Sequence, residues 1–309
     1  MNAMPPLEPI SMNQALLQIQ AERRDIELVW YRDMPLWIYK DDWLYNHIPV
    51  ERRGIDRSPF QRPRPAHPVG PDMVMLEHVL EHDPAALVFD VGCNYGVQAV
   101  RMLRTAAKLN GRIRAQLFDP GLAGKLSVLN CRMNGFDNFD FYYAAVSDTD
   151  GYVSVFINEG QTMDNKIINP RPQSLRMPVR AVRLADLLRD ADRNRLFFLK
   201  VDTQGAEYEV LRGLDDPSWR SRCAAIIEFV PGGLRSRVSP REFLEGLCAE
   251  FLVLDVGAVH EYVIEVTGDR AEEVIQRVKK VKPPFTDLLL LGRDLPERDA
   301  LVTKLKRMY

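Results

Sequence analysis

Short apolar runs alternate with longer amphipathic stretches along most of this chain of 309 residues. Runs rich in Val, Ile, Leu and Phe predict buried strands where they end at turn-forming residues. Such strands are expected at residues 87–91, 113–118, 139–143, 196–201, 224–230, 251–256 and 286–291. Helices are expected around them, at residues 73–81, 97–108, 122–134 and 240–250. Strands that alternate with helices in this rhythm predict an α/β fold with a mostly parallel, doubly wound sheet.

The middle of the chain departs from this rhythm. Asp150-Gly151 stands between apolar runs and predicts a hairpin turn, with residues 152–157 as the returning strand. Residues 159–178 are polar and aperiodic, as expected of a surface loop near a site. A short helix is expected after this loop, at residues 182–188.

The first part of the chain has a pattern of its own. A helix is expected at residues 12–25, and Trp37-Ile38-Tyr39 lies in an aromatic-rich stretch that favours a strand or hairpin. This stretch is either a lid or platform for a sugar-like or aromatic substrate, or a small satellite core. Residues 52–68 are rich in Arg and Pro and predict an extended linker. The chain is therefore divided into an N-terminal extension, residues 1–69, and a main α/β domain, residues 70–309.

Composition and charge exclude several classes of protein. The chain is 46% hydrophobic and 27% charged, and its formal net charge of −2 gives no basic field to gather nucleic acid. No apolar run approaches the length of a membrane span, and the N-terminus lacks the core of a signal peptide. The four cysteines have no C-x-x-C spacing, which favours reduced, structural thiols. A cytoplasmic protein without a nucleic-acid partner is the simplest interpretation.

The turn after the first strand of the main domain has the features of a nucleotide-binding loop. Gly92 and Gly96 allow a sharp turn and a close approach of a ligand to the main chain. Asn94, between them, is one of the few other residues that tolerates a positive φ. The helix that follows directs its free N–H groups at the contents of the loop.

The charge of this loop indicates which nucleotide it binds. A dinucleotide fingerprint has the form G-x-G-x-x-G, whereas the motif here is D-x-G-x-x-x-G, with Asp90 at the end of the strand. A carboxylate beside the turn repels a pyrophosphate and suits a cationic ligand that carries an ammonium and a sulfonium, which is S-adenosylmethionine. The alternative is that Asp90 only caps the turn.

Acidic residues also follow three other predicted strands. Asp119 lies 23 residues after Gly96, close to the distance at which an acidic residue binds ribose hydroxyls in α/β nucleotide sites. Asp202 and Glu228 end two further strands. Because ligands bind outside the carboxyl ends of the strands in such sheets, these groups are expected to gather around one cationic ligand.

The assembled motifs resemble those of the FkbM family of S-adenosylmethionine-dependent methyltransferases. The matching segments, in chain order, are Phe89–Gly96, Phe118–Pro120, Asn130 with Asn134, Ala145–Asp148 with Gly151, Lys200–Glu207 with Leu211 and Gly213, and Ile227-Glu228. The family usually has Glu-Pro where this chain has Asp119-Pro120, which shortens the reach to the ribose. Residues 1–69 carry no part of the resemblance.

The resemblance implies a Rossmann-like class I methyltransferase fold, with a seven-stranded, mostly parallel sheet whose last strand is antiparallel. It implies transfer of a methyl group from S-adenosylmethionine, usually to a hydroxyl of a small-molecule or glycan acceptor such as a sugar, a glycolipid or a secondary metabolite. The positions implied to bind the cofactor are Asp90, Gly92, Asn94, Gly96, Asp119, Ala145 and Asp202.

Methyl transfer to a hydroxyl depends on positioning and benefits from a general base. The candidates for this base are Asp202, Glu207 and Glu228, with His260 as a weaker one. We expect Asp202 to carry the role. Lys200 could orient Asp202 or pair with it structurally, but the alternation of side chains is expected to place it on the opposite face of the strand, where it cannot easily neutralise Asp202. The carboxylates could instead hold a divalent metal such as Mg²⁺, and no spacing in the sequence decides between the two.

Two other classes of protein stay open. A nicotinamide-dependent oxidoreductase on a similar sheet is disfavoured by Asp90 and by the missing G-x-G-x-x-G. A non-catalytic scaffold that binds a partner through its extension is disfavoured by the intact acidic positions. The extension is expected to close over an acceptor pocket or to form an oligomer contact rather than to fold alone, so a homo-oligomer is one of the open alternatives.

Overall fold

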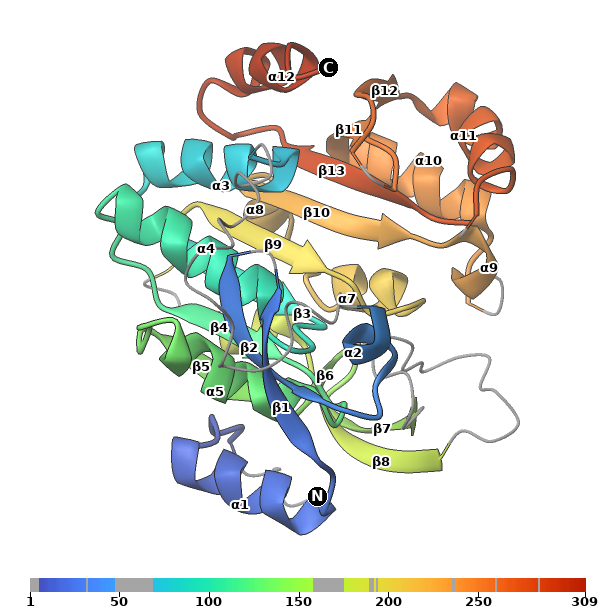
Figure 1. Ribbon diagram of the computed structural model, residues 1–309. Coiled ribbons are helices and arrows are strands. Elements are labelled where there is room, and N and C mark those ends of the chain that lie inside the picture. The colour runs from blue at the N-terminus through green and yellow to red at the C-terminus, as the bar shows by residue number, and fades with distance from the viewer. Residues whose placement is uncertain are drawn as a thin grey trace.

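A computed structural model describes residues 6–31, 33–47, 69–157, 175–188, 192, 194–234, 237–258, 260–282 and 284–309. Its centre is a twisted sheet with helices on both faces (Figure 1). Within the described residues, the strands of this sheet follow the order β12-β11-β13-β10-β9-β3-β4-β5. Their bounds, in chain order, are β3 (Leu87–Val91), β4 (Ala115–Phe118), β5 (Phe139–Tyr142), β9 (Phe197–Val201), β10 (Cys223–Phe229), β11 (Phe251–Asp255), β12 (Ile264–Val266) and β13 (Thr286–Gly292).

The mixed α/β fold with a mostly parallel sheet is confirmed. Strands β5, β4, β3, β9 and β10 pair in parallel, whereas β13 runs antiparallel to both β10 and β11. The predicted number of seven strands is wrong for this sheet, which has eight in the described part of the chain. The additional strand, β12, has three residues, too few to produce a hydrophobic period that the sequence could reveal.

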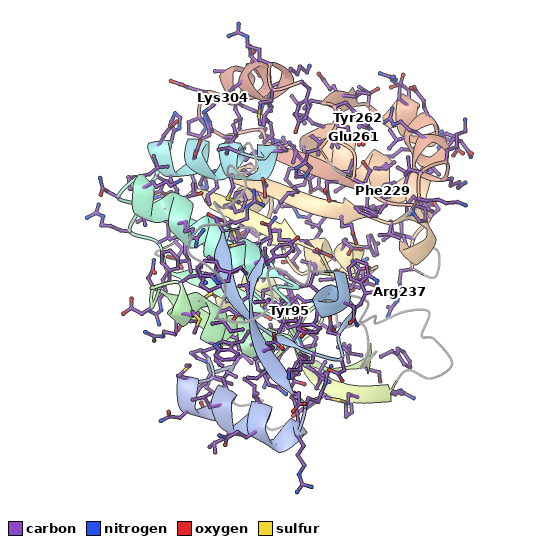
Figure 2. The ribbon with its side chains drawn as sticks, in the orientation of Figure 1. Tyr95, Phe229, Arg237, Glu261, Tyr262 and Lys304 are labelled. Carbon is purple, nitrogen blue, oxygen red and sulfur yellow. The ribbon has the colours of Figure 1, made fainter. Side chains whose placement is uncertain are left out.

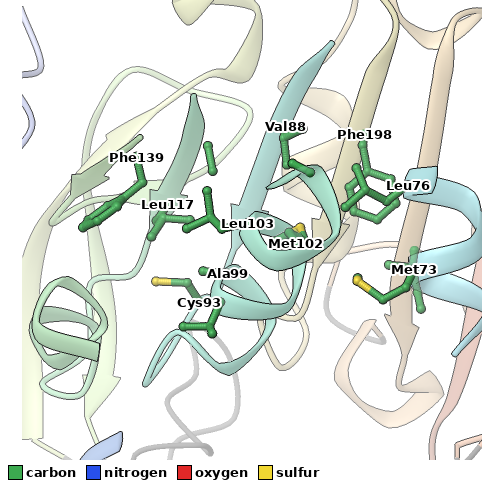
Figure 3. Close-up of a cluster of buried hydrophobic side chains, with 14 of the residues drawn as sticks. Met73, Leu76, Val88, Cys93, Ala99, Met102, Leu103, Leu117, Phe139 and Phe198 are labelled. Carbon is green, nitrogen blue, oxygen red and sulfur yellow. The ribbon is translucent and has the colours of Figure 1, made fainter. Parts of the chain in front are cut away.

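Alternation of side chains along the strands divides the core between two faces of the sheet. Val88 and Phe198 pack with α3 (Pro71–His82) and α4 (Val97–Lys108), as Figure 3 shows. Phe89 and Phe197, their neighbours in sequence, pack on the other face. The helices of the first face also include α5 (Gly124–Met133) and α12 (Arg298–Lys306); those of the second are α6 (Leu184–Leu187), α7 (Glu207–Arg212), α8 (Pro217–Arg220), α9 (Pro231–Leu234), α10 (Pro240–Glu250) and α11 (Ala271–Val278).

A second, three-stranded sheet corrects the prediction for the middle of the chain. It contains β6 (Ala145–Val146), β7 (Gly151–Ile157) and β8 (Leu175–Val182) in the order β6-β8-β7. The returning strand exists, but the predicted hairpin is wrong, because β8 lies between β6 and β7. Of the predicted loop at 159–178, residues 159–174 lie outside the described residues and 175–178 belong to β8.

The N-terminal segment packs against the first face of the main domain. It forms α1 (Met12–Glu22), the hairpin of β1 (Ile26–Tyr31) and β2 (Met34–Tyr39), and α2 (Trp43–His47). The predicted strand or hairpin at Trp37–Tyr39 is confirmed, and α1 ends earlier than predicted because Arg23 adopts a left-handed backbone conformation. The predicted linker at 52–68 lies outside the described residues.

Polar contacts fix this segment to α5. The side chain of Asn130 accepts a hydrogen bond from the backbone N–H of Trp37 (2.6 Å) and donates to its carbonyl (3.1 Å) and to the carbonyl of Tyr95 (2.9 Å). Asn134 donates to the carbonyl of Pro35 (2.9 Å). Buried residues of the segment, Ala15, Ile19, Val29, Met34, Leu36, Ile38, Tyr39 and Leu44, belong to the same core as α4 and α5. The segment therefore shares its hydrophobic core with the main domain.

All four cysteines are free thiols, as expected. In the described residues, no helix has the length and apolar character needed to span a bilayer.

Candidate functional site

A cavity of about 1200 Å³ opens at the carboxyl ends of the central strands. The loops after β3, β4 and β9 line it, together with residues from β10 and β13. The predicted site residues among its walls are Gly92, Asn94, Asp119, Ala145, Asp202 and Glu228. The N-terminal segment and the C-terminus also contribute to the walls, through Tyr31, Asp33, Met34, Trp43, Leu44, Met308 and Tyr309.

The glycine turn after β3 is held against the turn after β9. Gly92 has a φ of +82°, and a Cβ at this position would lie 2.8 Å from the carbonyl carbon of Asp202 and closer still to its oxygen. The backbone N–H of Asp202 donates to the carbonyl of Val91 (2.9 Å). A hydrogen bond and a close backbone contact therefore hold the two turns together. Only glycine satisfies both the conformation and the space. Asn94 has a φ of +48°, as its residue type suggested.

Gly96 has a packing role at the start of α4. Its φ is +76°, and a Cβ here would lie 2.8 Å from the Cβ of Ser127 in α5. Gly96 is not among the residues that line the cavity. It therefore supports the loop from behind, and its placement does not favour the predicted contact with a cofactor.

Tyr95 links the glycine turn to the N-terminal hairpin. Figure 2 shows its side chain beside the β1–β2 hairpin, and its ring centroid lies 6.4 Å from that of Tyr39. Since the carbonyl of Tyr95 also accepts from Asn130, the turn and the hairpin are fixed through the same part of α5.

Asp119 lines the cavity and braces two backbone turns. Its Oδ2 accepts a hydrogen bond from the N–H of Asn94 (2.7 Å) and its Oδ1 from the N–H of Gly121 (2.6 Å). Burial raises the pKa of the Asp119 carboxyl to about 6, against the lowering effect of these two bonds. A carboxylate has about four acceptor sites, so roughly two remain for a ligand.

Lys200 contacts both Asp90 and Asp202, which together with Glu228 and Glu207 form an acidic cluster, and its position corrects a prediction. Its Nζ lies 3.2 Å from Oδ2 of Asp202 and 3.6 Å from Oδ1 of Asp90. The expectation that Lys200 faces away from Asp202 is wrong, because residues two apart on a strand share a face. Burial would lower the pKa of Lys200, but the charges of Asp202 and Asp90 raise it above its ordinary value.

Asp90 lies beneath the cavity rather than in its wall. Its side chain is completely buried, and it is not among the lining residues. Burial raises the pKa of Asp90, while the positive charge of Lys200 lowers it. The predicted contact between Asp90 and a cationic ligand is therefore replaced by an ion pair with the protein's own ammonium group.

Gln204 connects Asp202 with Glu228. Its side-chain N–H group donates to Oδ1 of Asp202 (3.0 Å) and to Oε2 of Glu228 (2.7 Å). Burial, and then the negative charges of Asp202 and Glu207, raise the pKa of Glu228 well above its ordinary range. Glu228 is thus a carboxyl group that favours its neutral form.

Glu207 organises the turn after β9 and is not in the wall of the cavity. Its Oε1 accepts from the N–H (3.0 Å) and hydroxyl (2.9 Å) of Thr203 and from the N–H of Gly205 (3.1 Å). The side chain is 1% exposed, so an acceptor hydroxyl has no path to it. Its placement argues against the predicted catalytic role and gives it a structural one.

A histidine–carboxylate pair forms a further part of the wall. Nε2 of His260 lies 3.1 Å from Oδ2 of Asp287, and both residues line the cavity. Asp287 stands beside Glu228 in the register of β10 and β13. The sequence singled out His260 alone, because Asp287 lies within an apolar strand far along the chain and nothing local reveals the pairing.

No group of three or more His, Cys, Asp or Glu side chains in the described residues has a geometry that could hold a metal ion.

A mostly parallel α/β sheet with a glycine turn and a cavity at its carboxyl edge is the architecture in which open α/β proteins bind their ligands. The family model of the methyltransferase FkbM domain matches residues 74–276, more than half of the chain. This chain therefore belongs to the FkbM methyltransferase family.

Two known proteins are similar to parts of this chain. Methyltransferase sdnD of Sordaria araneosa is 32% identical over 108 residues, which are 32% of this chain and 35% of that protein. The crystal structure of methyltransferase FkbM from Methylobacillus flagellatus is 13% identical, with a TM-score of 0.38, over 67% of this chain and 44% of that one. This chain thus matches about a third of the length of the curated relative.

Proposed function

We propose that this protein transfers the methyl group of S-adenosylmethionine to a hydroxyl oxygen of a small-molecule or glycan acceptor. The observation that carries the proposal is the position of the cavity, where the glycine turn of a methyltransferase family member meets Asp119 and Asp202. The family assignment also favours methyl transfer over the nicotinamide-dependent alternative.

The residues of the cavity fit S-adenosylmethionine. Asp119 retains acceptor sites for a ribose diol after it has bound the N–H groups of Asn94 and Gly121. Oδ1 of Asn94 is buried and accepts no hydrogen bond from the described residues, so a donor on the cofactor would satisfy it. Ala145 and Gly92 add walls without bulky side chains.

The electrostatics suit a cationic ligand less strongly than the sequence suggested. Lys200 offsets one of the two charges of Asp90 and Asp202, and Glu228 favours its neutral form. Lys200 leaves one of the charges of Asp90 and Asp202 without an internal counter-ion, which still favours a cationic ligand.

S-adenosylmethionine, when bound, supplies a methyl group on a positively charged sulfur. The work of the protein is then to hold an acceptor oxygen in line with that group and to exclude water. The walls formed by Tyr31 and Trp43 lie on the N-terminal segment and present aromatic surface. Such surface stacks well against sugar rings or the flat parts of a secondary metabolite. We assign this side of the cavity to the acceptor.

Isothermal titration calorimetry tests the cofactor part of the proposal. Wild-type protein is titrated with S-adenosylmethionine, S-adenosylhomocysteine and NADH, and only the first two are expected to bind. Asp119→Ala should weaken this binding by about 1–3 kcal/mol, because its polar partners lose their acceptor. Asp140→Ala is the matched control, since Asp140 pairs with Arg114 outside the cavity. Equal affinities for Asp119→Ala and the wild type would remove Asp119 from the site.

Transfer of a radiolabelled methyl group to a panel of glycans and phenolic metabolites tests the acceptor part. Label in an alkali-stable ether would support transfer to oxygen. Label that appears only in amines or carbon-linked products would contradict it.

A further inference from the structure

We propose that His260 is the base that removes the proton of the acceptor hydroxyl, and that Asp287 positions it. The inference rests on the proposed methyl transfer to oxygen. The role of general base, which the sequence analysis gave to Asp202, is here given to His260 with the support of Asp287.

The geometry of the pair is that of a partly buried imidazole oriented by a carboxylate. The side chains of His260 and Asp287 are 24% and 19% exposed, and Nε2 of the ring lies 3.1 Å from the carboxylate. The other ring nitrogen, Nδ1, lies 3.4 Å from the point where a Cβ on Gly70 would stand, and Gly70 also lines the cavity. The ring is therefore held on one side by a carboxylate, and on the other it borders the part of the cavity wall formed by Gly70 and the guanidinium of Arg101.

The backbone of His260 supports a dedicated role. Its φ is +55°, a left-handed conformation that costs a residue other than glycine free energy. Its N–H donates to the carbonyl of Gly257 (3.2 Å), which closes a tight turn after β11. The turn thereby directs the imidazole at Asp287 in the neighbouring strand.

Asp287 determines which nitrogen of the ring carries the proton. An ionised carboxylate only accepts hydrogen bonds, so it favours the neutral imidazole with hydrogen on Nε2. The lone pair is then on Nδ1, the nitrogen that faces Gly70. Burial raises the pKa of Asp287, and the hydrogen bond from His260 opposes this rise and favours the charged carboxylate.

The carboxylates of the acidic cluster are less suited to this role. Asp202 is ion-paired with Lys200 through one oxygen and accepts a hydrogen bond from Gln204 on the other, so its negative charge is already partly offset. Glu228 favours its neutral form, which has no charge with which to take up a proton. Glu207 lies behind the wall of the cavity. His260 lines the cavity, and the described residues make no hydrogen bond to its Nδ1.

The transfer step balances with this base. The acceptor oxygen forms a bond to the methyl carbon, its proton passes to Nδ1 of His260, and the electron pair of the carbon–sulfur bond stays on sulfur. The products are a methyl ether, a neutral thioether and an imidazolium beside Asp287. One positive charge moves from the sulfur to the ring, where the carboxylate stabilises it. No further reactant is required.

The first experiment compares two histidine variants. His260→Asn keeps a residue that tolerates a positive φ. It should reduce the rate of methyl transfer by about 10²–10⁴-fold, the range for a lost general base, with affinity for S-adenosylhomocysteine unchanged. His82→Asn is the control, because His82 is also 24% exposed beside a carboxylate, that of Glu297, but lies outside the cavity. It should transfer at the wild-type rate.

The second experiment uses Asp287→Asn and reads the ring directly. The amide can donate to Nε2 and should shift the proton to Nδ1, which removes the lone pair that faces the acceptor. Nitrogen-15 NMR of labelled histidine at mildly alkaline pH distinguishes the two tautomers. The signals of His260 are identified by their loss in His260→Asn. We expect hydrogen on Nε2 in the wild type, hydrogen on Nδ1 in Asp287→Asn, and a matching loss of transfer.

The outcomes separate this inference from the proposed function. Wild-type turnover in His260→Asn, or an Nδ1–H tautomer in the wild type, overturns the assignment of the base and leaves methyl transfer intact. A wild-type protein that fails to bind S-adenosylmethionine contradicts the proposed function itself.

Discussion

The contact between the glycine turn and the loop after β9 predicts the cost of a single methyl group. Gly92→Ala places a Cβ 2.8 Å from the carbonyl carbon of Asp202 and closer to its oxygen, where real Cβ atoms essentially never lie. The alanine must also adopt a φ near +82°, which costs about 1 kcal/mol. Displacing the neighbouring loop adds about 1–3 kcal/mol, as overpacking does in cores. The expected total is about 2–4 kcal/mol of unfolding free energy.

Gly135→Ala isolates the steric part of this cost. Gly135 has a φ of +86°, almost that of Gly92, but apart from its chain neighbours no atom of the described residues lies within 4 Å of its Cβ position. Its substitution should therefore cost only about 1 kcal/mol. Urea denaturation of both variants gives the difference, and calorimetry with S-adenosylhomocysteine should show weaker binding for Gly92→Ala alone. Equal destabilisation of the two variants would refute the close approach of the turns, because strain in φ would then account for the whole loss of unfolding free energy.

Four further predictions address charge, metal and docking. Affinity for S-adenosylmethionine should fall as the pH drops through about 6, where Asp119 becomes neutral, and calorimetry across this range checks it. The pKa of Asp119 is higher in the folded protein than in the unfolded chain. The contribution of Asp119 to stability is therefore present at acidic pH and is lost as the pH rises through about 6. Asp202→Asn should weaken cofactor affinity about tenfold and slow transfer less than His260→Asn does, which steady-state kinetics measures. Dialysis against a chelator should leave transfer unchanged, because the amide of Gln204 already binds both nearby carboxylates. Asn130→Ala should lower the unfolding free energy by about 2–4 kcal/mol in urea denaturation, since three backbone groups lose their partner.

The sequence predicted the parts of the fold that depend on local pattern. Strand β3 and helices α4 and α10 have the bounds expected from their apolar residues, because a buried strand or an amphipathic helix carries its period within its own residues. The glycine turn was predicted for the same reason, since the need for a positive φ at Gly92 is a property of one position. Asp119 and Asp202 were placed at the correct edge because parallel strands end together.

The sequence failed where the outcome depends on a distant partner. The turn at Asp150-Gly151 indicated a reversal of the chain, but β8, from a separate part of the chain, supplies the strand that pairs with β7. The sequence showed an acidic residue at position 90, but it did not show that Lys200, from another strand, forms an ion pair with it. The sequence around Asp287 gave no sign of its role, because the role of a single acidic residue in an apolar strand depends on the residues of the neighbouring strand and loop that it contacts. Long-range pairing, rather than propensity, decides each of these cases.

Asn130 and Asn134 explain why the N-terminal segment belongs to the site. The sequence associated both residues with the family motif, yet neither lines the cavity. Their side chains instead bind the backbone of β2, and Asn130 also binds the carbonyl of Tyr95, next to Asn94 in the glycine turn. One buried amide thus links the glycine turn, the side proposed to bind the cofactor, to the N-terminal wall. Because methyl transfer depends on the alignment of two bound molecules, a rigid link between the walls that hold them is what this chemistry requires.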